Sequence, residues 1–176
     1  MIDKEKLLKL KPIHVDVEGS TLVGSQNGVD FNLFKIDWIK TPMVFRQIDQ
    51  WLIKPIFAVR EYAIPLKDFE PKFILDCGGN IGTSAVFFAN YYPDAKITAV
   101  EPDAGNFQLL EINTKAYPNV KCINAALWGK ESYIELQGWH PSSYKAFETD
   151  ANNSDAIKTT TVAKLLADSG FDEIDN

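Results

Sequence analysis

The chain has 176 residues, of which 45% are hydrophobic and 24% charged, and this suits a globular protein with a core of its own. Its formal net charge of -6 argues against nucleic acid or an anionic membrane as a partner. No stretch has the apolar length that crosses a bilayer, and the first residues lack the apolar segment of a secretion signal. We therefore expect a cytoplasmic protein that acts on a small molecule or a glycan, with no nucleic acid and no membrane as partner.

The first 70 residues differ in pattern from the rest and predict a small β-rich and helical region. Gln26-Asn27-Gly28 is a turn signal between two alternating segments, which indicates a hairpin. The apolar residues of the second segment change parity halfway, which predicts either a bulge or a strand covered on both sides. Over residues 41–57 the apolar spacing favours a helix, which Pro55 would end or kink.

Residues 71–176 alternate predicted strands and helices, which is typical of a Rossmann-like α/β domain with a parallel sheet and right-handed crossovers. In chain order, we predict a strand over 73–77, a helix over 81–92, a strand over 97–100, a helix from Pro102 to about Ala116, a strand over 120–127, a short strand over 132–137, a polar loop over 138–155, a return strand over 157–160, and a helix that begins at Thr161 and stops at Gly170.

The most informative segment is the glycine-rich stretch after the strand over 73–77. Asp76 stands near the end of this strand, and Gly78 and Gly82 follow it before a helical pattern begins. Glu101 ends the next strand about 20 residues later, where an acid can accept hydrogen bonds from both hydroxyls of a ribose. The segment therefore predicts a nucleotide-binding strand, loop and helix.

Two ligand classes use such a loop, and the residues favour one of them. A dinucleotide-binding loop needs a glycine where this chain has Asn80, because the backbone must approach a pyrophosphate. Asp76 would repel a pyrophosphate but could hold the ammonium group of an amino acid. We therefore expect S-adenosylmethionine as the cofactor, and an NAD-dependent oxidoreductase is a weaker alternative.

Three motifs together make the chain similar to a known family. They are Ile74–Gly82, with the pattern Asp-x-Gly-x-Asn-x-Gly; Ala99–Asp103, which contains Glu-Pro-Asp and is followed by Asn106, Phe107 and Asn113; and Asn124–Trp128, which begins Asn-Ala-Ala-Leu. Over roughly residues 44–175 the chain resembles the FkbM family of S-adenosylmethionine-dependent methyltransferases. The resemblance implies a class I methyltransferase sheet and O-methylation of a hydroxyl on a sugar or a polyketide-like small molecule.

The resemblance also implies a role for each motif residue in cofactor binding. The loop residues Asp76, Gly78, Gly79, Asn80 and Gly82 would surround the methionine part, Glu101 would hold the ribose, Pro102 and Asp103 would shape the adenine side, and Asn124 and Ala125 are further adenine-side candidates. No residue is predicted as the general base. No metal site is predicted, since neither cysteine has a metal-ligand spacing.

Family members continue past a segment like Phe171–Asp175 into strands that complete the sheet and help to form the acceptor pocket. The sheet is therefore expected to be incomplete at its C-terminus, and the chain to be a truncated methyltransferase. A non-catalytic cofactor-binding or assembly module is the alternative. An incomplete sheet would leave the strand over 73–77 with an unpaired apolar edge, which favours a homodimer through that edge.

Overall fold

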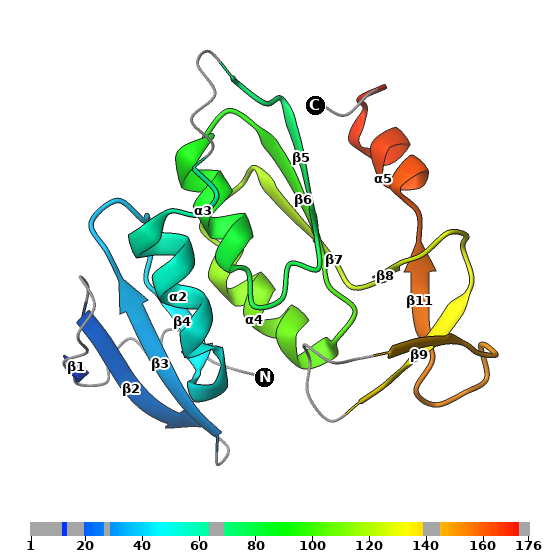
Figure 1. Ribbon diagram of the computed structural model, residues 1–176, viewed down its shortest axis with the longest axis horizontal. Helices are drawn as coiled ribbons and strands as arrows, with labels where there is room; N and C mark the ends of the chain where they lie inside the picture. The colour runs from blue at the N-terminus through cyan, green and yellow to red at the C-terminus, as the bar shows by residue number, and fades with distance from the viewer. Residues whose placement is uncertain (1–11, 14–19, 27–28, 64–68, 139–144, 173–176) are drawn as a thin grey trace.

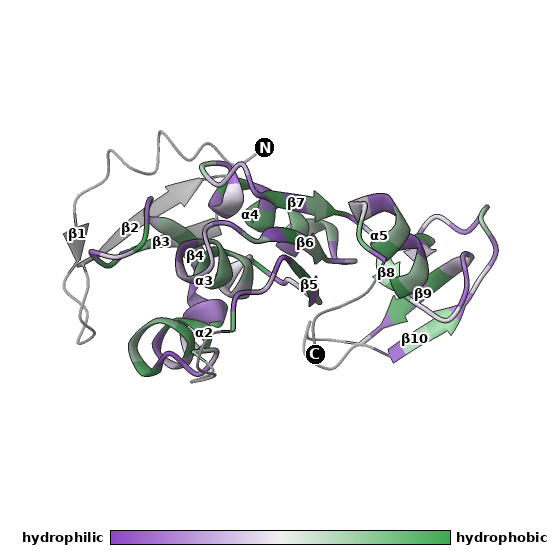
Figure 2. Cartoon of the chain, turned by 90° about the horizontal axis from the view of Figure 1, so that it is seen from above, coloured by the Kyte–Doolittle hydropathy of each residue, from purple (hydrophilic) through white to green (hydrophobic). Residues whose placement is uncertain are grey.

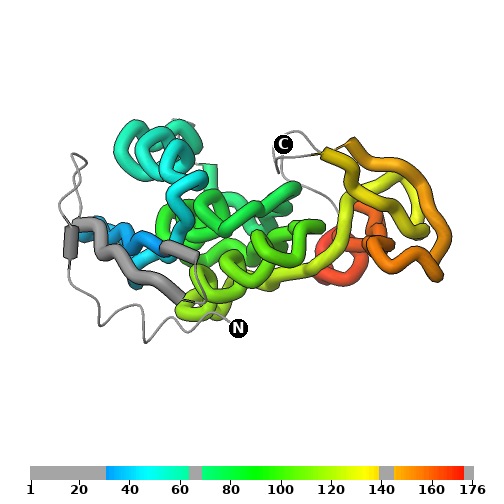
Figure 3. Tube along the Cα trace, turned by 90° about the horizontal axis from the view of Figure 1, so that it is seen from below, coloured from blue at the N-terminus to red at the C-terminus, as the bar shows by residue number. Residues whose placement is uncertain are grey.

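The structure is a computed structural model that describes residues 12–13, 20–26, 29–63, 69–138 and 145–172 (Figure 1). The described strands form an N-terminal sheet of four strands, a central parallel sheet of three strands and a third sheet of four strands. Figures 2 and 3 place the N-terminal sheet and the third sheet at opposite ends of the molecule, with the central sheet between them. None of the described helices combines the length and the apolar character that a membrane crossing requires.

The N-terminal sheet is antiparallel and has the strand order β1 (Pro12–Ile13), β2 (Ser20–Gln26), β3 (Val29–Lys35) and β4 (Met43–Arg46). β2 and β3 pair without interruption, which confirms the two strands of the predicted hairpin, whereas its turn at 27–28 lies outside the described residues. Phe31, Leu33 and Phe34 of β3 are all buried. The parity change therefore reflects a strand covered on both sides, and the register contains no bulge between Ser20 and Gln26.

The helix predicted over residues 41–57 is wrong in its first part, which forms β4. Met43, Val44 and Phe45 are consecutive buried residues, and such a run suits a strand with both faces covered. Helical structure begins only after β4, with a 3₁₀ turn (Gln47–Asp49), α2 (Gln50–Ile53) and a π-helical segment (Lys54–Val59). Pro55 does not end this stretch, but the helix changes from the α to the π type at Lys54, directly before this proline.

The central sheet contains β5 (Phe73–Cys77), β6 (Lys96–Val100) and β7 (Val120–Ile123), all parallel, with β6 in the middle. α3 (Thr83–Tyr91) connects β5 to β6, and α4 (Ala104–Thr114) connects β6 to β7. These elements confirm the predicted Rossmann-like α/β fold.

The third predicted strand is too long, because the chain leaves the central sheet after Ile123. β8 (Ala126–Leu127) pairs instead with β11 (Ile157–Thr160), which also pairs with β9 (Tyr133–Gln137). β9 and β11 confirm the short strand and the return strand. β10 (Lys145–Glu148) lies in the segment predicted as a polar loop; its side chains are mostly exposed, so the sequence carries no apolar alternation there. α5 (Val162–Ser169) begins after Thr161 and ends at Gly170, as predicted.

One hydrophobic core joins the N-terminal sheet to the helices of the central domain. Leu33, Val44 and Phe57 belong to it, together with Ile81 and Phe87 from the start and the middle of the α3 region. Figure 1 shows α3 and α4 between the N-terminal sheet and the central sheet. A smaller cluster with Val100, Ala125 and Leu165 packs α5 against the central sheet.

Candidate functional site

The carboxyl ends of the parallel strands meet at one edge of the central sheet (Figure 1). Asp76 is the penultimate residue of β5, Glu101 directly follows β6, and Asn124 directly follows β7. Because β6 lies between β5 and β7, these residues follow one another across the edge. Ligands of open α/β sheets bind outside this edge, so the predicted residues converge where the fold offers a site.

The loop between β5 and α3 folds back onto β6. The backbone N–H groups of Gly78 and Gly79 both donate to the carbonyl oxygen of Val100, at 2.9 Å each. Gly78 and Gly82 have φ angles of 82° and 89°, which favour glycine. A β-carbon on Gly82 would lie 3.0 Å from Cδ1 of Leu110, whereas one on Gly78 would meet no atom within 4 Å. The loop is therefore packed tightly against α4 at Gly82 and is open at Gly78.

Glu101 is buried at this edge, with 5% of its surface exposed. Its Oε2 accepts a hydrogen bond from the backbone N–H of Asn80, and its Oε1 accepts one from the backbone N–H of Asp103, both at 2.9 Å. The side-chain amide of Asn106 also donates to Oε1, at 3.4 Å. Burial raises the pKa of Glu101, and these hydrogen bonds oppose the rise. Glu101 thus connects the glycine loop to the start of α4.

Asp76 is half-buried at the end of β5. The hydroxyl of Ser84, in the first turn of α3, donates to its Oδ2 at 2.7 Å. Burial raises the pKa of Asp76, and the bond from Ser84 opposes the rise. No ion pair to Asp76 is found within the described ranges. A partly desolvated carboxylate without a cation suits the binding of a positively charged group.

Asn80 lies in the middle of the glycine loop with a φ angle of 48°. Its side-chain Oδ1 is buried and has no hydrogen-bond partner among the described residues. Most buried polar atoms in native proteins are hydrogen-bonded, so an unpaired one calls for an explanation. The loop therefore offers an acceptor that a donor from a bound molecule would satisfy.

The start of α4 differs slightly from the prediction. Asp103 is the N-cap, and its Oδ1 accepts from the backbone N–H of Asn106 at 2.8 Å. Pro102 therefore precedes the helix and does not lie in its first turn. The backbone N–H of the same N-cap residue donates to Glu101, as described above.

A groove of about 570 Å³ opens beside this edge. It is lined by Pro102, Asp103, Ala104 and Asn124 from the central domain, by Leu136 and Gly138 at the end of β9, and by residues 154–158 at the start of β11. The amide of Asn124 donates to the carbonyl oxygens of Glu101 at 2.8 Å and Pro102 at 3.2 Å, which fixes the loop after β6. Ala125 does not line this groove, because it is packed in the core against Val100 and Leu165.

Arg46, Ser84 and Asn106 also belong to this site, but sequence reasoning assigned none of them a role. Ser84 could have been found, since a residue in the first turn of the helix faces the end of the preceding strand. Asn106 stands in one of the family motifs. Arg46 donates to Oδ1 of Asn106 at 2.6 Å across 60 residues of sequence, and no local pattern indicates such a contact.

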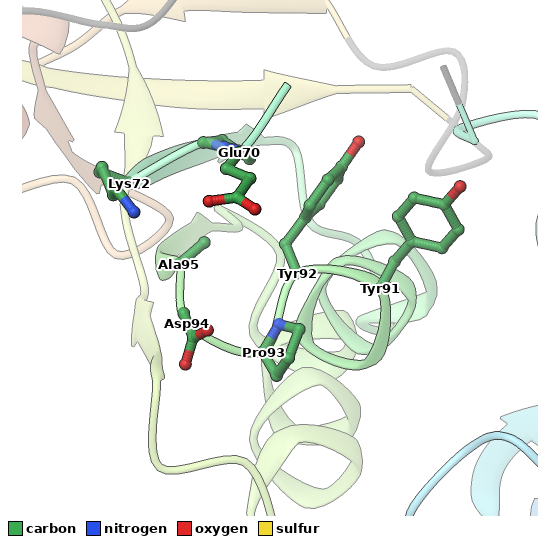
Figure 4. Close-up of a pocket in the computed structure, with 8 residues that line it drawn as sticks. Glu70, Lys72, Tyr91, Tyr92, Pro93, Asp94 and Ala95 are labelled. Carbon is green, nitrogen blue, oxygen red and sulfur yellow. The ribbon is translucent and has the colours of Figure 1, made fainter. Parts of the chain in front are cut away.

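A smaller cavity, of about 150 Å³, lies at the amino ends of β5 and β6 (Figure 4). Its lining residues precede these two strands: Glu70, Pro71, Lys72, Tyr91, Tyr92, Pro93, Asp94 and Ala95. It contains none of the predicted site residues. Within the part of the chain that the structure describes, no group of His, Cys, Asp and Glu is arranged to hold a metal ion.

The chain shows a partial likeness to several solved structures. A protein described as a caffeoyl-CoA O-methyltransferase from Staphylococcus aureus is 24% identical over 44% of this chain and 47% of its own, with a TM-score of 0.31. Fibrillarin from Aeropyrum pernix, in complex with S-adenosylmethionine, is 16% identical over 66% of this chain and 58% of its own, with a TM-score of 0.37. A protein described as a spermidine synthase from Corynebacterium glutamicum is 19% identical over 65% of this chain and 44% of its own, with a TM-score of 0.33.

The chain spans about half the length of these structures, with 47%, 58% and 44% covered. TM-scores of this size carry no argument about ligand or activity, so the fold assignment rests on the strand order and register given above. No protein-family model matches the chain, and no curated protein matches it in sequence.

Proposed function

We propose that this chain binds S-adenosylmethionine at the carboxyl edge of β5, β6 and β7, as part of an FkbM-type methyltransferase that methylates a hydroxyl of a sugar or a polyketide-like small molecule. The observation that carries the proposal is the meeting of Asp76, the open glycine loop and buried Glu101 at one edge of a Rossmann-like sheet. Membership of the family rests on the sequence motifs, and the comparisons add no independent support for it.

The amino-acid end of the ligand fits the glycine loop. Asp76 offers its ammonium group a carboxylate that pairs with no cation among the described residues. The space beside Gly78 lets the ligand approach the backbone, because a β-carbon there would meet no atom within 4 Å. The unpaired Oδ1 of Asn80 supplies a buried acceptor in the same loop. A pyrophosphate would find two acceptors here, which disfavours NAD.

The ribose of the ligand fits Glu101, although with less freedom than the sequence predicted. An ionised carboxylate can accept about four hydrogen bonds, and Asn80, Asp103 and Asn106 already provide three donors. One acceptor direction of Glu101 then remains for a ribose hydroxyl. We therefore propose that Glu101 binds one hydroxyl strongly and does not accept equally from both.

The adenine fits the groove beyond Glu101. Asp76, Glu101 and Asn124 lie in this order across the edge, so a ligand anchored at Asp76 and Glu101 extends toward Asn124. The groove contains Pro102 and Asp103, and about 570 Å³ is a common size for a small-molecule site. We propose no contact of adenine with the side chain of Ala125, which is buried in the core.

The bound cofactor would supply a methyl group on a sulfonium, and the residues of this chain would bind and orient it. Correct placement of two reactants can contribute roughly 7–11 kcal/mol to lowering a barrier. Asp76 and Glu101 would hold the amino-acid end and the ribose, which lie on either side of the sulfonium, so that the methyl group keeps one position.

Calorimetry with S-adenosylhomocysteine tests the binding proposal. We expect binding that Asp76→Asn weakens, because the neutral amide removes the negative charge that attracts the ligand ammonium. Lys130→Gln, which removes an exposed ion pair with Glu148, serves as the control and should bind as the wild type does. Absence of binding at millimolar ligand would refute the proposal, and binding of NADH instead would support the oxidoreductase.

Turnover tests the second part of the proposal. Methyl transfer from labelled S-adenosylmethionine to a sugar or polyketide hydroxyl would exclude the non-catalytic module. Cofactor binding without transfer to any member of a broad acceptor panel would favour that module.

A homodimer through β5 is also a proposal. β5 is an outer strand of its sheet among the described residues. Part of its surface is covered, since the ring of Phe171 stacks on that of Phe73 with the ring centroids 5.4 Å apart. Light scattering at high concentration tests this pairing, and a monomer mass at every concentration would exclude it.

A further inference from the structure

We propose that Arg46 is a positioning residue of the nucleotide site, because it orients the side-chain amide of Asn106 toward Glu101. The inference rests on the proposed function, since it concerns how Glu101 is prepared for a ribose. It also gives the N-terminal region a part in the site, because Arg46 is the last residue of β4.

The guanidinium of Arg46 is held in a fixed orientation. Its Nε donates to Oδ2 of Asp49 at 2.7 Å, and its Nη2 donates to Oδ1 of Asp49 at 2.9 Å. Two parallel bonds of this kind define the plane of the guanidinium. Asp49 is buried, with 4% of its surface exposed, and it also accepts from the backbone N–H of Arg46 at 2.9 Å. Asp49 therefore fixes the orientation of the guanidinium independently of its bond to Asn106.

The chemistry of the three side chains allows only one direction of hydrogen bonding. A guanidinium can only donate, so Asn106 must present its Oδ1 to Arg46, and this bond is 2.6 Å long. The amide nitrogen of Asn106 then faces Glu101, whose ionised carboxylate can only accept, with Nδ2 and Oε1 3.4 Å apart. Arg46 therefore selects the one amide orientation that supports Glu101.

Loss of Arg46 would remove this selection without dismantling the loop. The amide of Asn106 could turn over and direct its oxygen at the carboxylate, which repels it. The backbone donors of Asn80 and Asp103 would still hold Glu101, each at 2.9 Å. We therefore expect a defect in how Glu101 binds a ligand, in addition to the loss of stability that follows from leaving buried Asp49 without its cation.

A comparison of two ligands tests this role. In the wild type, S-adenosylhomocysteine should bind about 10- to 100-fold more tightly than an analogue that lacks both ribose hydroxyls. Arg46→Gln should reduce this preference about fivefold to tenfold and leave the affinity for the analogue within about twofold. Arg46→Lys should restore part of the preference, since it keeps a cationic donor without the planar fork. Lys130→Gln is the control and should change neither affinity.

A second measurement needs no ligand and separates the inference from the proposed function. The pKa of Glu101, followed by carboxyl NMR, should be higher in Arg46→Gln than in the wild type, because the bond from Asn106 favours the ionised form. If the wild type binds neither ligand, the proposed function fails, and this pKa still decides the role of Arg46. An unchanged pKa, or an equal loss of affinity for both ligands, would overturn the inference.

Discussion

Asn113 connects the N-terminal sheet to the glycine loop, and its replacement by alanine should be strongly destabilising. The side chain is fully buried. Its Oδ1 accepts from the N–H of Val44 at 2.7 Å, and its Nδ2 donates to the carbonyl oxygens of Val44 and Ile81 at 2.8 Å each. Val44 lies in the outer strand β4. The side-chain amide of Asn113 pairs with both the N–H and the carbonyl oxygen of Val44, as the next strand of the sheet would.

The magnitude follows from the groups that Asn113→Ala leaves unpaired. Three buried backbone groups lose their partner, at about 1–3 kcal/mol each before water or relaxation compensates. We expect a loss of about 3–5 kcal/mol in the free energy of unfolding, which is a large part of the stability of a typical domain. Asn113→Asp keeps the acceptor for Val44 but turns a second oxygen toward two carbonyls, so it should be at least as destabilising near neutral pH.

Urea denaturation followed by circular dichroism measures both variants. Asn152→Ala is the control, because Asn152 is an exposed residue that bonds to Asp150, and it should change stability by less than about 0.5 kcal/mol. Lowering the pH should recover part of the loss in Asn113→Asp, since a protonated carboxyl can donate to one carbonyl. A loss below about 1 kcal/mol for Asn113→Ala would refute the reasoning.

Asp76→Asn should be more stable than the wild type at neutral pH. Burial raises the folded-state pKa of Asp76 above its ordinary value of 3.8, so the contribution of this acid to stability is greatest below that value and is lost as the pH rises through the raised pKa. Urea titrations across this range should show an advantage of the variant that grows with pH, and a constant difference would contradict it. Gly82→Ala should lower stability by roughly 1–3 kcal/mol and more than Gly78→Ala, since both have positive φ but only the first new β-carbon meets Leu110 at 3.0 Å. Thermal unfolding compares the two, and equal losses would show that the contact does not matter. Asp103→Ala should cost about 1 kcal/mol through the lost N-cap of α4. Thr161→Ala at α5 provides a second cap for comparison, and no loss in Asp103→Ala would show that the cap is not needed.

The central fold could be predicted because its signals are local. Glycines after β5 and a polar cap before α5 mark the element ends, and parallel strands bring residues such as Asp76 and Glu101 to one edge. β4 was missed because Met43, Val44 and Phe45 are buried on both faces, so the strand has no alternation. β10 was missed for the opposite reason, since its side chains are mostly exposed.

The site could be predicted only where its contacts follow from the order of the strands. The convergence of Asp76, Glu101 and Asn124 at one edge follows from this order, whereas the bonds from Asn80 and Asp103 that occupy Glu101 were not predicted. Arg46 reaches Asn106 only because the N-terminal sheet packs beside α4, and that packing depends on the whole fold. The unpaired oxygen of Asn80 likewise becomes visible only once the loop has its shape.

The shared core has a consequence for how the chain folds during synthesis. β3 and β4 leave the ribosome before α3 and α4 exist, yet Leu33 and Val44 are buried in the cluster that holds Ile81 and Phe87. Proteins whose contacts are distant in sequence fold slowly, and exposed apolar strands favour aggregation meanwhile. The apolar residues of the emerging N-terminal strands therefore stay without their packing partners until the helices that cover them have been made.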